Sequence, residues 1–73
     1  MATHQELEFA RISLREELEA IDNYQRRVDA AKDEELKRIL QHNMDEEKEH
    51  TAMLIEWLRK ADETQNKVFE KHD

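Results

Sequence analysis

Residues 34–60 read EELKRILQHNMDEEKEHTAMLIEWLRK, a segment without glycine or proline. A three–four spacing that starts at Leu36 selects a row of side chains, here called the C-terminal row: Leu36, Leu40, Asn43, Glu47, His50, Leu54, Trp57 and Ala61. This spacing places the row on one face of an α-helix, as in helices that present a face to a bundle core. The row is apolar at both ends, but its middle carries an amide, a carboxylate and an imidazole.

An N-terminal row with the same spacing precedes it: Leu7, Ala10, Leu14, Glu17, Ile21, Tyr24 and Val28. We predict one helix over about residues 5–30 and a second over about residues 34–60, folded into an antiparallel hairpin. Asp33 suits the N-cap of the second helix, where its side chain can accept a backbone hydrogen bond. One continuous helix is an alternative, because Ala30 and Ala31 do not stop a helix.

The composition narrows the class of protein. The chain has 73 residues, no cysteine and a net charge of −7, and 42% of its residues are charged. Missing cysteine excludes disulfides and thiolate-bound metal, and missing glycine and proline disfavours a sheet. No apolar run approaches the roughly 20 residues of a membrane span, and an acidic chain without a basic stripe is a poor partner for nucleic acid. Residues 1–7 are polar and do not resemble a signal peptide, so we expect a cytoplasmic protein.

The chain is short enough to need reinforcement of its core. We interpret residues 1–73 as a single half-domain, because a core of this size is normally supported by metal or by a partner chain when it lacks disulfides. The tail, residues 61–73, is polar apart from Val68 and Phe69. It either forms a short third helix that docks on a neighbour or remains a frayed end.

Three ligand-type side chains converge when the hairpin is folded. Glu17 lies about as far before the turn as Glu47 lies after it, and at about 1.5 Å per residue the two reach nearly the same level. His50 follows one turn beyond Glu47 on the same face. An ionised carboxylate in such a row costs several kcal/mol unless it is compensated, and neither row contains lysine or arginine. A metal ion is the simplest compensator.

One chain supplies too few ligands for a site with two metal ions. Two chains supply four glutamates and two histidines, which is the complement of ferritin-like carboxylate sites. We therefore predict that the hairpin pairs about a two-fold axis into a four-helix bundle, with ligands from both subunits. One imidazole per metal among carboxylates favours Fe(II), Mn(II) or Zn(II) over copper.

The same residues also have interpretations that do not involve metal. The polar residues of the two rows could serve only to fix register in a non-enzymatic helical oligomerisation module. Tyr24 reads either as core or as a neighbour of the site. Glu16 and Glu19 read either as solvated residues or as groups that attract cations. Met44 and Met53 read as packing residues, since methionine commonly fills gaps in a core.

The segments EELEAIDNY at residues 16–24 and DEEKEHTAM at residues 45–53, with EWLR at residues 56–59, resemble the two helices of the encapsulated ferritins. The resemblance runs from about residue 15 to residue 60. It implies a two-helix ferritin-like protein that forms a dimer, a ring of dimers, and a cargo carried inside an encapsulin shell in the cytoplasm.

For function, the resemblance implies a ferroxidase that oxidises Fe(II) to Fe(III) at a di-iron centre, with two iron ions per dimer. It makes Glu17, Glu47 and His50 the ligands from each subunit. It places Glu16 and Glu19 where metal ions enter, and Tyr24 beside the centre. The same ligand set would also suit a peroxide-reducing or di-manganese enzyme.

Two features depart from the family pattern. Asn23 stands where the family often has tryptophan, so the role of that aromatic ring in shaping the access path does not carry over. The family's shell-addressing tail contains glycine and leucine, and these 73 residues contain no glycine. Association with a shell is therefore implied by the resemblance alone.

Overall fold

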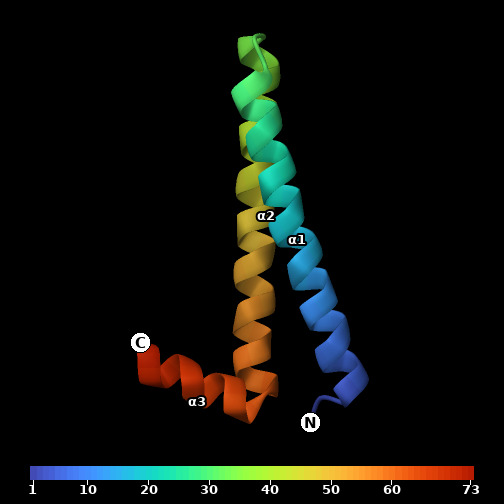
Figure 1. Cartoon of the computed structure of the whole chain (residues 1–73), viewed down its shortest axis with the longest axis vertical. Coiled ribbons are helices and arrows are strands. Elements are labelled where there is room, and N and C mark those ends of the chain that lie inside the picture. The colour runs from blue at the N-terminus through green and yellow to red at the C-terminus, as the bar shows by residue number, and fades with distance from the viewer.

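The chain folds into three helices and contains no strand. The computed structural model describes all 73 residues: α1 spans His4–Ala30, α2 spans Glu34–Ala61 and α3 spans Glu63–His72 (Figure 1). The predicted all-α class is confirmed, and the tail forms the short third helix. None of these helices combines the length and apolar character needed to cross a membrane.

The hairpin turns at residues 31–33 because both flanking helices are capped there. Ala31 leaves the helical region with φ −69° and ψ 135°, and its N–H still donates to the carbonyl of Arg27 at 2.9 Å. Asp33 is the N-cap of α2, and its side chain accepts from the N–H of Leu36 at 2.8 Å. The turn contains no residue with positive φ, so it needs no glycine. The continuous helix does not form.

Helix α1 begins with a reciprocal cap. The Thr3 hydroxyl accepts from the N–H of Glu6 at 3.0 Å, and the N–H of Thr3 donates to the Glu6 carboxylate at 2.9 Å. This pair satisfies two backbone donors that the first turn would otherwise leave without partners. The backbone hydrogen bond from Thr3 holds the pKa of the Glu6 carboxyl below its ordinary value, and the side-chain hydrogen bond with Thr3 adds to the effect.

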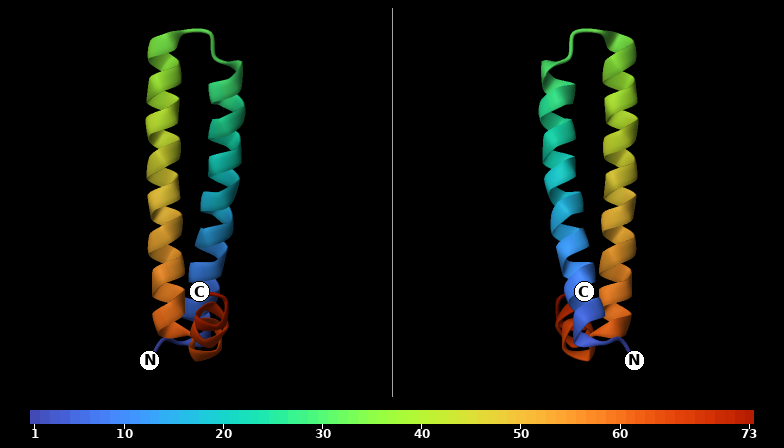
Figure 2. Two further views of the ribbon diagram at one scale, coloured as in Figure 1. Left: turned by 90° about the vertical axis from the view of Figure 1, so that its left-hand side faces the viewer. Right: turned by 90° about the vertical axis from the view of Figure 1, so that its right-hand side faces the viewer.

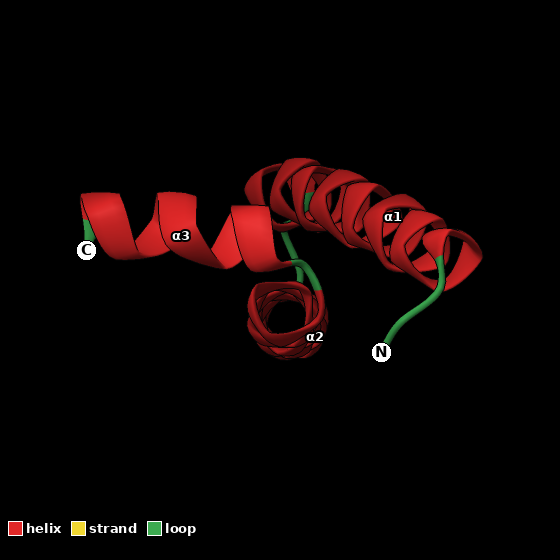
Figure 3. Cartoon of the chain, turned by 90° about the horizontal axis from the view of Figure 1, so that it is seen from below, coloured by secondary structure: helices red, strands yellow, loops and turns green.

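The two long helices lie side by side and cross obliquely. Near the loop they overlap in Figure 1 but stand apart in Figure 2, and towards the other end the relation reverses. Figure 3, seen along α2, shows α1 leaning across it, with α3 and the N-terminus on opposite sides. The molecule measures 46 × 27 × 13 Å, and its radius of gyration is 15.4 Å. A compact domain of this length would have a radius near 11 Å, so the chain is elongated.

The hairpin core is thin. Only Ala10, Val28, Met44 and Leu58 are buried, and Met44 is the most buried at 2% exposure. Met44 and Leu58 each come one position after a residue of the C-terminal row. Because one residue rotates an α-helix by about 100°, the buried face of α2 is rotated by about 100° from the row. Row members such as Leu36 and Trp57 are therefore left at the edge, exposed by 48% and 38%.

Helix α3 extends sideways from the end of the hairpin (Figure 1), and Arg59 of α2 contacts two of its side chains. The Arg59 guanidinium pairs with the Asp73 carboxylate at 2.8 Å and lies 4.9 Å from the centre of the Phe69 ring. Asp62 caps α3 by accepting from the N–H of Gln65 at 3.1 Å. It also pairs with Arg11 of α1 at 3.2 Å. These contacts place α3 at the end of the hairpin away from the loop (Figure 1).

Candidate metal centre

The structure brings Glu17, Glu47 and His50 together at one level of the hairpin. Each offers one ligand atom, and these atoms lie within 4.8 Å of one another. His50 Nδ1 is 3.5 Å from Glu17 Oε2 and 3.6 Å from Glu47 Oε2. No other group of three or more histidine or acidic side chains in the chain is arranged in this way.

The three side chains are positioned by regular helix geometry. Glu17 comes from the middle of α1, while Glu47 and His50 stand three residues apart on α2 and so share a face. The capped turn at residues 31–33 fixes the register of the two helices. The Thr51 hydroxyl donates a hydrogen bond to the backbone carbonyl of Glu47 at 3.0 Å, in addition to the backbone hydrogen bonds of α2.

The carboxylates of Glu17 and Glu47 lack a permanently charged basic partner. Glu17 Oε2 is buried and has no hydrogen-bond partner. Neither carboxylate pairs with lysine or arginine, and their only ion-pair partner is His50, which carries charge only when protonated. A buried acceptor without a partner loses its hydration without compensation.

The spacing fits metal ligation better than hydrogen bonding. Separations of 3.5 and 3.6 Å are long for a nitrogen–oxygen hydrogen bond. They suit two ligands of one ion when each metal–ligand bond is about 2.0–2.2 Å. Carboxylate oxygen with imidazole nitrogen is a donor set for iron, manganese or zinc. The donor types and the separation of His50 from each carboxylate therefore fit a divalent metal.

The centre opens into a groove between α1 and α2. The side chains of His50, Glu17 and Glu47 are 46%, 26% and 21% exposed. A cavity of about 470 Å³ lies beside them, and its lining is Ser13, Glu17, His50, Met53, Leu54 and Trp57.

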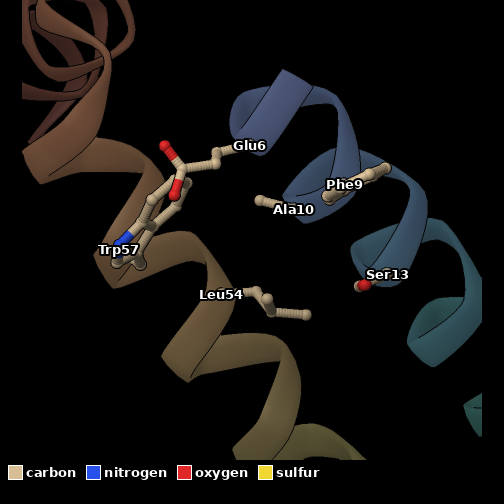
Figure 4. A pocket seen from close by; sticks show the side chains of 6 residues that line it. All are labelled: Glu6, Phe9, Ala10, Ser13, Leu54 and Trp57. Carbon is tan, nitrogen blue, oxygen red and sulfur yellow. The ribbon is translucent and has the colours of Figure 1, made fainter. Parts of the chain in front are cut away.

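A second cavity, of about 300 Å³, continues the groove towards the N-terminus of α1, as Figure 4 shows. The two cavities share Ser13, Leu54 and Trp57. The wall is mainly apolar, so Glu17 and His50 lie at one end of an apolar groove that opens to solvent.

The other residues considered from the sequence lie outside the three-ligand group. Tyr24 is half-buried, and the Arg27 guanidinium lies 5.6 Å from the centre of its ring. Glu16 and Glu19 are exposed on α1 beside Glu17. Sequence reasoning missed Ser13 as a neighbour of the site, although it stands one turn before Glu17, a spacing that would have indicated it.

Comparison with known proteins gives consistent matches. The EncFtn-like family matches residues 1–72. The encapsulated ferritin-like protein of Rhodospirillum rubrum is 63% identical over 51 residues, which are 70% of this chain and 36% of that protein. The ferritin-like protein of Thermotoga maritima is 58% identical over 48 residues, 66% of this chain and 42% of that protein.

A third curated relative and a solved structure also match the chain. The encapsulin nanocompartment cargo protein EncC of Myxococcus xanthus is 44% identical over 55 residues, 75% of this chain and 42% of that protein. The crystal structure of protein ne0167 from Nitrosomonas europaea has a TM-score of 0.86 and 57% identity, covering 92% of this chain and 74% of that one. The chain thus matches well under half the length of the curated relatives. With a family match over nearly its whole length and an all-α hairpin that carries the glutamate–histidine group, the chain belongs to the EncFtn-like family.

Proposed function

We propose that this chain is a ferroxidase subunit that binds Fe(II) through Glu17, Glu47 and His50 and completes its centre by pairing with a second copy. The observation that carries the proposal is the buried Glu17 Oε2 without a partner, 3.5 Å from His50 Nδ1. Family membership and the names of the relatives support an iron-related, ferritin-like role.

Two features support pairing with a second copy: the number of ligands that one chain supplies and the accessible surface area that it exposes. Two copies supply four glutamates and two histidines, enough to hold two iron ions as in ferritin-like sites. The chain exposes 5829 Å² at a mass of 8.9 kDa. A compact monomer of that mass would expose about 4,800 Å². The excess of about 1,000 Å² is comparable with one partner's share of a standard interface, about 800 Å².

In the proposed reaction iron is the substrate and supplies the one-electron redox chemistry. Two Fe(II) ions lose one electron each, and one O₂ takes both electrons with two protons to become hydrogen peroxide. The chain's own residues bind and orient the ions: the carboxylates of Glu17 and Glu47 offset their charge, and His50 binds as neutral imidazole. Glu16 and Glu19 concentrate cations at the side where they enter, and Tyr24 lies outside the ligand set.

The assembled state is proposed by analogy with the relatives. The Myxococcus relative is named as encapsulin nanocompartment cargo, and the Rhodospirillum relative as encapsulated. We propose that pairs of this chain assemble into a ring inside an encapsulin shell in the cytoplasm. The shell would then retain the Fe(III) product, because an open ring does not enclose a mineral.

The test is Fe(II) oxidation after Glu17→Ala. Metal-free protein is loaded with Fe(II) without oxygen, oxygen is added, and Fe(III) formation is followed by absorbance. Glu17→Ala is expected to reduce the rate of Fe(II) oxidation to that of iron in buffer, because the variant lacks a carboxylate that would offset the charge of the ion and position it. Glu56→Ala, on the opposite face of α2, is the matched control and is expected to keep the wild-type rate.

A near-normal rate in Glu17→Ala would remove Glu17 from the centre and with it the proposal. Oxidation that occurs with added peroxide but not with oxygen would instead identify the peroxide-reducing alternative.

A further inference from the structure

Leu18 is exposed on the side of the hairpin that faces away from the groove. It comes one position after Glu17, so the two side chains point about 100° apart around α1, and Leu18 lines neither groove cavity. Leu14, one turn earlier on the same face, instead lines a cavity of about 170 Å³ with Phe69 of α3. Helix α3 therefore meets this face at Leu14 but leaves Leu18 49% exposed. A second copy seated on the groove would not cover it.

Two charged side chains flank Leu18 on this face. Arg15 stands three residues before it and Asp22 four residues after it, so the three side chains lie in one row along α1. Both charged residues are exposed, and neither forms an ion pair within the chain. Arg15, Leu18 and Asp22 are here called the rear patch. It presents an apolar side chain between a free positive and a free negative charge.

The order of charges in the rear patch is self-complementary. Arg15 lies about 4.5 Å and Asp22 about 6 Å along the helix from Leu18, in opposite directions. When two such helices pack antiparallel with Leu18 against Leu18, Arg15 of each copy comes level with Asp22 of the other to within about 1.5 Å. Parallel packing would instead set Arg15 beside Arg15. Opposite charges thus favour one orientation, in which the same patch is used on both copies.

We propose that the rear patch is an interaction surface for a second copy of this chain, with the two α1 helices packed antiparallel about a two-fold axis at Leu18. The contact uses no metal ligand, so it goes beyond the metal-dependent pairing proposed above. One chain can make both contacts at once, because the groove and the rear patch lie on different faces. Two different two-fold contacts link pairs into a larger assembly, as the proposed ring requires.

The strength of the contact is limited by its size. Leu18 contributes apolar burial, while each ion pair between exposed side chains adds little and is screened by salt. The contact therefore forms at higher protein concentration than the metal-dependent pairing, and rising salt concentration weakens it.

The test is a mixing experiment on metal-free protein in chelator, with the mass followed by sedimentation as the protein concentration rises. The wild type is expected to pass from single chains to pairs. Arg15→Glu sets acidic groups against each other at both ends of the contact, and Asp22→Arg does the same with basic groups. Each variant alone is therefore expected to associate at least about tenfold more weakly. An equimolar mixture of the two variants is expected to regain the wild-type affinity, because both ion pairs re-form between unlike copies.

Two controls accompany the mixture. Glu56→Lys reverses an exposed charge on α2, outside the rear patch, and is expected to keep the wild-type affinity. Adding Zn(II) to the wild type at the same protein concentrations is expected to raise the mass beyond that of a pair, since both contacts then act. A mass that stops at that of a pair would contradict the use of the two contacts together.

Three results in chelator would overturn the inference: a wild-type chain that stays single at every concentration, variants that associate as the wild type does, or variants that remain impaired when mixed. The last result would mean that the rear patch meets a different surface, such as α3 of a second copy. None of these results depends on metal, so the proposed function would stand. Absence of Fe(II) oxidation by the wild type would instead overturn the proposed function and leave this contact in place.

Discussion

Glu17 is the residue whose surroundings are least satisfied by its own chain. One of its carboxylate oxygens is buried without a partner, and the nearest basic group is the imidazole of His50 at 3.5 Å. Leaving a carboxylate in that state costs free energy that a bound cation removes. The row spacing alone indicates Glu17, Glu47 and His50, because these ligand-type side chains interrupt two otherwise apolar faces.

At the same scale, His50→Ala is expected to lower metal content. The imidazole is the only nitrogen ligand in the group, and even loss of supporting contacts around a metal typically weakens binding by about 10–100-fold. Metal per chain would be measured by elemental analysis after loading with Fe(II) without oxygen and desalting. His72→Ala, an exposed histidine on α3, is the control. Equal metal content in the two variants would contradict a ligand role for His50.

At the scale of elements, the helices begin and end where side chains cap them. Thr3, Asp33 and Asp62 each accept a backbone hydrogen bond at the start of a helix. Asp33 was predictable, because it precedes an acidic first turn in the sequence. The hairpin, in preference to one continuous helix, depends on the extended backbone at Ala31, and alanine itself does not favour that conformation over a helix.

The cap of α1 gives a pH prediction at this scale. The pKa of Glu6 is lowered in the folded chain, so its contribution to stability is present above the unfolded pKa and is lost as pH falls through the folded one. Glu6→Gln keeps an acceptor but does not titrate. The excess stability of the wild type over this variant, measured by thermal unfolding, is expected to shrink as pH falls through that window. A difference independent of pH would show that the charge of Glu6 does not stabilise α1.

At the scale of the whole molecule, the chain is elongated and thinly packed. Its radius of gyration is 15.4 Å, and only four of its residues are buried. Large apolar side chains such as Phe9, Met53 and Trp57 are exposed by 55%, 63% and 38%. Exposed apolar surface on this scale is typical of interaction surfaces, and these three side chains lie along the groove that ends at Glu17 and His50.

We therefore expect metal binding and pairing of two chains to be coupled. The fluorescence of Trp57 can follow the pairing. Trp57 is the only tryptophan in the chain. Adding Zn(II), which has no redox chemistry, to dilute metal-free protein is expected to shift tryptophan emission to shorter wavelength and to double the mass in sedimentation. Both changes follow because a second copy would cover the groove and complete the ligand set. A chelator should reverse them. An unchanged mass with bound zinc would separate ligation from pairing.

The sequence by itself determined the helical class, the two rows and the three ligand candidates. Each of these depends on periodicity and residue chemistry, which are local properties of the chain. Only the tertiary structure decided which part of each face is used inside the hairpin. Met44 and Leu58 became the core of α2, while Trp57 and Met53 stayed exposed. The spacing of a row fixes a face to within about one residue, or about 100°. The crossing of α1 over α2 sets the rest, because it determines which side chains one helix covers on the other and which it leaves exposed.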